Sequence, residues 1–86
     1  MANSDPYTNT PTAMLYDVFA ETSNELIGRY TGLSDAAHDE SKRAQWWGLA
    51  LAVRDTRRLV PAHDREQLIT HIARWKADIE ALKASE

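Results

Sequence analysis

Apolar residues recur at alternating intervals of four and three along the last third of the chain, and this spacing constrains the fold more than any other feature. The series is Leu68, Ile72, Trp75, Ile79 and Leu82. Because an α-helix completes a turn about every 3.6 residues, side chains at these intervals lie on one helical face. The pattern therefore predicts a helix over about residues 62–84 that buries this heptad-like seam against other helices.

The same spacing predicts a helix near the start of the chain, over about residues 11–31. Its apolar face is formed by Leu15, Phe19, Thr22, Leu26 and Tyr30. Gly32 is expected to end this helix, because glycine adopts the left-handed conformation that often follows a helix end. Ser34 is expected to cap the next helix.

Between these two segments a helix is predicted over about residues 35–59. It should end before Pro61, because the residue that precedes a proline is disfavoured in the helical conformation. Asp64 and Gln67 have the spacing of a capping-box pair and mark the start of the last helix. A short loop is therefore expected between the second and third helices, and one long helix kinked at Pro61 is the alternative.

The length of 86 residues allows one domain. Three helical patterns without a strand pattern predict an all-α fold, an antiparallel three-helix bundle in up-down-up order with coiled-coil-like seams. The polar residues 1–10 are expected to be a flexible tail. Residues 11–86 then form a single three-helix domain, and a chain this small is expected to gain buried surface by self-association.

Composition removes several classes of function. The chain has no cysteine, which excludes disulfides, thiolate catalysis and cysteine-ligated zinc. Its longest apolar run is far shorter than the roughly 20 residues of a membrane-spanning helix, and its first residues lack the pattern of a secretion signal. A cytoplasmic protein without a membrane partner is expected. Arginine outnumbers lysine and alanine is abundant, a composition typical of GC-rich genomes such as those of actinobacteria and their phages.

The middle of the second helix is apolar on more than one side. An ordinary core stripe is formed by Trp46, Leu49, Ala50, Val53 and Val60. A second side, about 100–140° away around the helix axis, carries Trp47 and Leu51 and continues to Arg54 and Arg58. A helix in a monomeric bundle needs only one buried stripe. Either the second helix is central and contacts both neighbours, or these four residues bind a partner, as tryptophan and arginine often do.

Three small residues follow another line on the same helix, namely Ala44, Gly48 and Ala52. Glycine inside a helix costs about 1 kcal/mol relative to alanine. A close approach by another helix backbone would account for that cost. This strip is therefore predicted to be a site of close helix packing.

No arrangement of residues indicates catalysis, a metal or a cofactor. Asp35 and His38 have a metal-like i, i+3 spacing, but the first helix offers only polar-side glutamates to complete such a site. His63 lies in a predicted turn, and His71 lies beside the apolar seam of the third helix. The chain is therefore not expected to be an enzyme or to bind a small-molecule substrate.

These observations predict a non-catalytic module for protein–protein interaction, of the regulator, adaptor or inhibitor type. It should be a homodimer, or bind a protein partner, through Trp47, Leu51, Arg54 and Arg58 of the second helix. The alternative is a DNA-associated regulatory protein that binds phosphates through Arg54, Arg57 and Arg58. The net charge of −3 favours the first interpretation.

Overall fold

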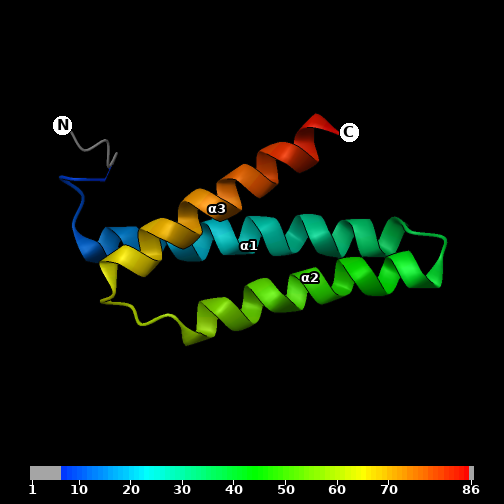
Figure 1. The fold of residues 1–86 in the computed structure, drawn as a ribbon, viewed down its shortest axis with the longest axis horizontal. Coiled ribbons are helices and arrows are strands. Elements are labelled where there is room, and N and C mark those ends of the chain that lie inside the picture. Colours follow the sequence, from blue (N-terminus) through cyan, green and yellow to red (C-terminus); the bar gives the residue numbers. More distant parts are fainter. Residues whose placement is uncertain (1–6, 86) are drawn as a thin grey trace.

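The computed structural model describes residues 7–85, which form three helices and contain no strand. The helices are α1 (Thr12–Ala36), α2 (Glu40–Leu59) and α3 (Arg65–Ala84), as Figure 1 shows. The prediction of an all-α helical bundle is confirmed. No helix in this part of the chain is both long enough and apolar enough to cross a membrane.

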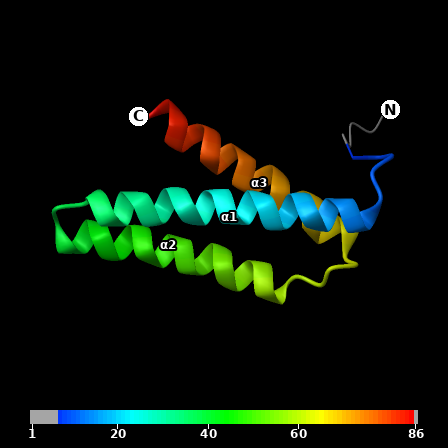
Figure 2. The same cartoon turned by 180° about the vertical axis from the view of Figure 1, so that it is seen from behind.

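The central element is α1. It packs against both other helices, whereas no Cα atom of α2 comes within 8 Å of a Cα atom of α3. In Figures 1 and 2, α2 lies along α1, while α3 crosses α1 near the start of α1 and then diverges from it. The alternative in which the second helix lies centrally between the other two is therefore wrong. The described Cα atoms extend over 47 × 26 × 16 Å, so the molecule is a flat slab.

The central position of α1 follows from its wide buried face. The buried residues of α1 are Leu15, Phe19, Thr22, Ser23, Leu26, Tyr30 and Ser34, and they cover about 120° of its circumference. Two of the polar members are satisfied within the helix: the Thr22 hydroxyl donates to the Val18 carbonyl and the Ser23 hydroxyl to the Ala20 carbonyl, both at 2.7 Å. Small, satisfied side chains let a neighbouring helix come close without leaving buried polar atoms unpaired.

Packing between α1 and α3 buries the largest side chains that α3 contributes to the core. Leu68 and Ile72 of α3 are fully buried, and Trp75 is 5% exposed. The indole of Trp75 stacks on the ring of Phe19, with ring centroids 5.1 Å apart. Each buried side chain of this size contributes about 1.5–3 kcal/mol through the hydrophobic effect. The apolar seam predicted for the third helix is thus its core face.

The end of α1 differs from the prediction. Gly32 does not end the helix: α1 continues to Ala36. No glycine of the described chain has the positive φ that the predicted helix end requires. Ser34 is a buried residue of α1 rather than a cap, and its hydroxyl donates to the Arg43 carbonyl at 3.0 Å. The N-cap of α2 is Asp39, which accepts from the Ser41 backbone N–H. A contact with the following helix therefore outweighs the local preference of Gly32.

A loop, and not a kink, connects α2 to α3. The α2 helix ends at Leu59, and residues 60–64 are not helical. The predicted pair at the start of α3 forms half of a capping box: Asp64 accepts from the Gln67 backbone N–H at 3.1 Å. The Gln67 side-chain amide donates to the Asp64 carboxylate at 2.7 Å, and the Asp64 backbone N–H donates instead to the Pro61 carbonyl at 3.1 Å. The two hydrogen bonds from Gln67 lower the pKa of Asp64, the side-chain bond having the larger effect. Local capping chemistry was therefore readable from the sequence.

Residues 7–10 are attached to the start of α3. The Arg65 guanidinium donates to the carbonyl oxygens of Tyr7 and Thr10, the second at 2.6 Å. Tyr7 also packs against the core. The segment predicted as a flexible tail thus includes a turn that is held by charge-assisted hydrogen bonds; residues 1–6 lie outside the described part of the chain.

Candidate protein-binding surface

Within residues 7–85, a single stripe of α2 is buried against the rest of the fold. Ala50 and Val53 are buried against α1, and the Trp46 indole stacks on the Tyr30 ring with centroids 5.9 Å apart. Leu49 was predicted for the same stripe but is 45% exposed. It lines the open space between α2 and α3 that the divergence of α3 leaves. The fold therefore covers less of α2 than the apolar sequence of this helix would suggest.

The four predicted partner-binding residues lie on the uncovered side of α2. Trp47 is 50% exposed, Leu51 is half-buried, and Arg54 and Arg58 are exposed. The exposed half of a tryptophan leaves roughly 100 Å² of mainly apolar surface in contact with water. Covering that surface with a partner would contribute about 2.5 kcal/mol.

A shallow hollow lies beside Trp47, at the end of the slab where α1 and α2 are linked. Its volume is about 280 Å³, and it is lined by Ser34, Glu40, Arg43, Ala44 and Trp47. The indole forms one wall and the Glu40 carboxylate is exposed at another. The hollow thus combines an apolar wall with charges of both signs, from Glu40 and Arg43, and could take the apolar stem of a long side chain from a partner.

The strip of small residues is also free of packing within the described chain. Ala44, Gly48 and Ala52 are all exposed. A Cβ atom added to Gly48 would meet no atom within 4 Å. No other helix of the described chain therefore contacts Gly48, and the small residue that α2 buries is instead Ala50.

The predicted arginine cluster is divided between two roles. Arg57 is turned toward α1, where its guanidinium donates to the Asn24 side-chain carbonyl at 2.5 Å and to the Ser23 hydroxyl at 3.4 Å. Arg54 is exposed and lies 3.6 Å from the Asp55 carboxylate. Arg58 is exposed, with no ion pair in residues 7–85. Two of the three arginines are thus available to a partner, and Arg57 ties α2 to α1.

The space between α2 and α3 is a groove that the sequence did not reveal. It holds about 220 Å³ and is lined by Tyr30, Leu49, Ala52, Val53, Thr56, His71, Arg74, Trp75 and Asp78. Burial raises the pKa of Tyr30; the negative charge of Asp78 adds to the rise, and the positive charge of Arg74 opposes it. The phenol is therefore neutral at physiological pH. It offers a hydrogen-bonding group and not a nucleophile.

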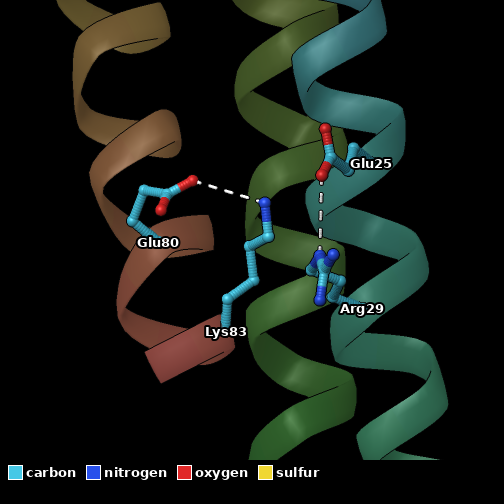
Figure 3. A network of polar contacts seen from close by, with 4 residues as sticks. All are labelled: Glu25, Arg29, Glu80 and Lys83. Carbon is cyan, nitrogen blue, oxygen red and sulfur yellow. Dashed lines mark hydrogen bonds and ion pairs between the residues drawn. The ribbon is translucent and has the colours of Figure 1, made fainter. Parts of the chain in front are cut away.

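A second groove follows the divergent end of α3. Its volume is about 370 Å³, and its lining consists of Gly28, Arg29, Gly32, Leu33, Trp46, Leu82 and Ser85. Figure 3 shows the polar residues near it: Arg29 pairs with Glu25 at 3.6 Å and Lys83 with Glu80 at 3.5 Å. Both ion pairs lie within a single helix. Neither one holds the end of α3 against α1.

No group of three or more histidine, aspartate and glutamate side chains within residues 7–85 is arranged to hold a metal ion. The exposed large apolar residues of the same region are Met14, Trp47, Leu49 and Leu59. Three of these four belong to α2, and Trp47 has the largest side chain. Most of the exposed large apolar side chains of residues 7–85 therefore belong to α2.

No family model, curated protein or solved structure matches the chain. The surface of α2 and the chemistry of the residues that form it are therefore the features that indicate a function.

Proposed function

We propose that the protein is a non-catalytic interaction module that self-associates through the outward side of α2. The observation that carries this proposal is the half-exposed Trp47, which lies next to Leu51 and is followed by Arg54 and Arg58 on a side that no other helix covers. Tryptophan and arginine are the residues most enriched at binding hot spots. A small protein with an incomplete core also gains buried surface by pairing.

The proposal includes the up-down-up order of the three helices. Two contacts support it: the end of α1 meets the start of α2 through Ser34 and Arg43, and the end of α2 meets the middle of α1 through Arg57 and Asn24. In this order α2 is an outer helix of the slab. Its second side is then available to another chain.

A protein partner is favoured over DNA by the placement of the arginines. Phosphate binding by the cluster would need Arg54, Arg57 and Arg58 to act together. Arg57 already donates to Asn24 and Ser23 of α1, and Asp55 lies beside Arg54. The remaining exposed cations, Arg54 and Arg58, follow the apolar pair Trp47 and Leu51 along α2, and charged residues beside an apolar centre are typical of a protein–protein interface with a polar rim.

The test is the concentration dependence of the molecular mass. Sedimentation equilibrium should show a monomer–dimer equilibrium for the wild type. Trp47→Ala should raise the dimer dissociation constant by roughly a hundredfold, because it removes one indole from each copy and so two from a symmetric interface. Met14→Ala is the matched control, since Met14 is 56% exposed but lies on α1. This control should dimerise like the wild type.

Two results would argue against the proposal. A wild type that remains monomeric up to millimolar concentration would contradict the proposed self-association. If Trp47→Ala associates as strongly as the wild type, the interface does not include this side of α2. Circular dichroism of both variants should be helical like the wild type, which separates loss of association from loss of folding.

A further inference from the structure

The outward side of α2 carries a regular series of six residues. Their intervals are four, three, four, three and four, and the series, called here the outer seam, is Glu40, Ala44, Trp47, Leu51, Arg54 and Arg58. Five of the six are exposed and Leu51 is half-buried. Intervals of this kind place side chains along one line of a helix and are typical of the contact line of a coiled coil.

The outer seam is complementary to itself when it is read in reverse. The series is symmetric about position 49: each member before this position has a counterpart at the same distance after it. The resulting pairs are Glu40 with Arg58, Ala44 with Arg54, and Trp47 with Leu51. A negative residue thus matches a positive one, and a large aromatic residue matches an aliphatic one.

We propose that two copies of this chain pair through their outer seams, with α2 against α2 in opposite directions about a twofold axis at position 49. This inference rests on the proposed self-association and specifies its geometry. It commits to a second copy as the partner because the complementary residues are all present on one face. A twofold axis makes each pair occur twice in the dimer.

The centre of the proposed interface is apolar. Trp47 of each copy lies opposite Leu51 of the other, which gives two aromatic–aliphatic contacts close to the axis. Gly48 lies beside Leu51 on the helix surface, three residues earlier, and has no neighbour within 4 Å of an added Cβ. The small residue leaves room for the indole of the second copy to lie against the α2 backbone.

The ends of the interface are charged, and their charges select the direction of pairing. Neither Glu40 nor Arg58 forms an ion pair in the part of the chain that the structure describes. Opposite directions bring the Glu40 carboxylate of one copy to the Arg58 guanidinium of the other. The same direction would bring Glu40 to Glu40 and Arg58 to Arg58, and both contacts would be repulsive.

Arg54 strengthens the same choice of direction. In the proposed pairing it lies opposite Ala44 of the second copy, at the hollow beside Trp47. That hollow is also lined by Glu40, which lies one turn before Ala44. Because Arg43 also lines the hollow, its charge is mixed. Opposite directions still avoid the contact of Arg54 with Arg54 that the same direction would create.

The proposed contact runs along almost the whole of α2. Residues 40–58 span about 27 Å at the rise of an α-helix. A free helix of this length would be marginal in water and would lose entropy on pairing. Here α2 is already held by α1 through its buried face and Arg57. Pairing therefore does not have to order the α2 backbone; its entropy cost comes from side chains and from the lost translational and rotational freedom of the two copies.

Reversal of the end charges tests this geometry. Glu40→Arg alone and Arg58→Glu alone each convert two attractive contacts of the dimer into two repulsive ones, so each should raise the dimer dissociation constant by about tenfold. The double variant Glu40→Arg/Arg58→Glu restores two attractive contacts and should return to within about threefold of the wild type. Sedimentation equilibrium measures all three variants.

Glu66→Arg is the matched control for the effect of the substitution on helix stability. Glu66 is exposed in the first turn of α3, as Glu40 is in the first turn of α2. Both substitutions place a positive charge at the positive end of a helix. Only the change at position 40 should weaken the dimer.

Disulfide formation gives an independent measure of register, because the chain has no cysteine of its own. Ala44→Cys/Arg54→Cys should form a covalent dimer on mild oxidation. Ala44→Cys alone should not, since positions 44 of the two copies would be about 15 Å apart along the helix axes.

The outcomes separate the two proposals. A wild type that dimerises, with single variants unchanged or a double variant as weak as the singles, would overturn the pairing about position 49 and leave self-association standing. A wild type that is monomeric at every concentration would overturn both proposals. Rescue by the double variant, together with the cross-link between positions 44 and 54, supports the pairing.

Discussion

Helices α2 and α3 are both 20 residues long and both pack against α1, yet they are covered very differently. Almost every large apolar side chain of α3 is buried or half-buried, with Trp75 stacked on Phe19. On α2 only Ala50 and Val53 are buried, while Trp47 and Leu49 remain about half exposed. The apolar residues of α3 are thus explained by folding. Those of α2 indicate a further contact.

The largest difference is expected between the two tryptophans. Trp75→Ala should destabilise the chain by about 3–5 kcal/mol, because it removes a buried aromatic side chain from the core. Trp47→Ala should destabilise the chain less, by about 1–2.5 kcal/mol, since only half of this side chain is buried. Urea denaturation of the monomeric chain measures both. Equal losses would mean that Trp47 belongs to the core as much as Trp75 does.

A smaller difference is expected between two adjacent arginines of α2. Arg57→Ala should cost about 1 kcal/mol, because it removes hydrogen bonds to Asn24 and Ser23 that connect α2 to α1. Arg58→Ala should leave the unfolding free energy within about 0.5 kcal/mol of the wild type. The same denaturation experiment applies to both. A larger loss for Arg58 would contradict the assignment of this residue to the outer seam.

Gly48 should distinguish folding from association. Gly48→Ala should stabilise the monomer by about 0.5–1 kcal/mol, since the new methyl group meets nothing within 4 Å and alanine favours the helix. It should weaken the dimer, because the methyl group takes the room left for the second copy. Gly28→Ala on α1 is the control: similar open space surrounds it, so it should stabilise the chain without weakening the dimer.

The smallest effect concerns the start of α3. Hydrogen bonds from Gln67 lower the pKa of Asp64 below its usual value of 3.8. The ionised cap therefore stabilises the fold fully above that value, and this contribution is lost as the pH falls through the lowered pKa. Asp64→Asn keeps a capping side chain that does not titrate. Between pH 5 and pH 2.5, the urea midpoint of this variant should decline less than that of the wild type, which chemical denaturation can measure. An identical decline would show that ionisation of the Asp64 cap does not cause the loss of stability at low pH.

Local features of the fold could be predicted from the sequence, and its arrangement could not. The seam of α3 and the Asp64–Gln67 cap depend on neighbours within seven residues and were correctly predicted. The end of α1 was misplaced at Gly32, because Ser34 and Arg43 form a contact between two helices that no local rule includes. The α2–α3 groove around Tyr30 was missed for the same reason.

The sequence by itself determined that this chain is helical and which side chains share a face of each helix, because helical periodicity is a property of the backbone. It also placed Trp47 and Leu51 on a different side of α2 from Trp46. Only the tertiary structure decided that α1 is central and that the side carrying Trp47 remains uncovered. Those outcomes depend on how wide faces and small buried side chains fit between helices, and such fits involve residues far apart in the chain.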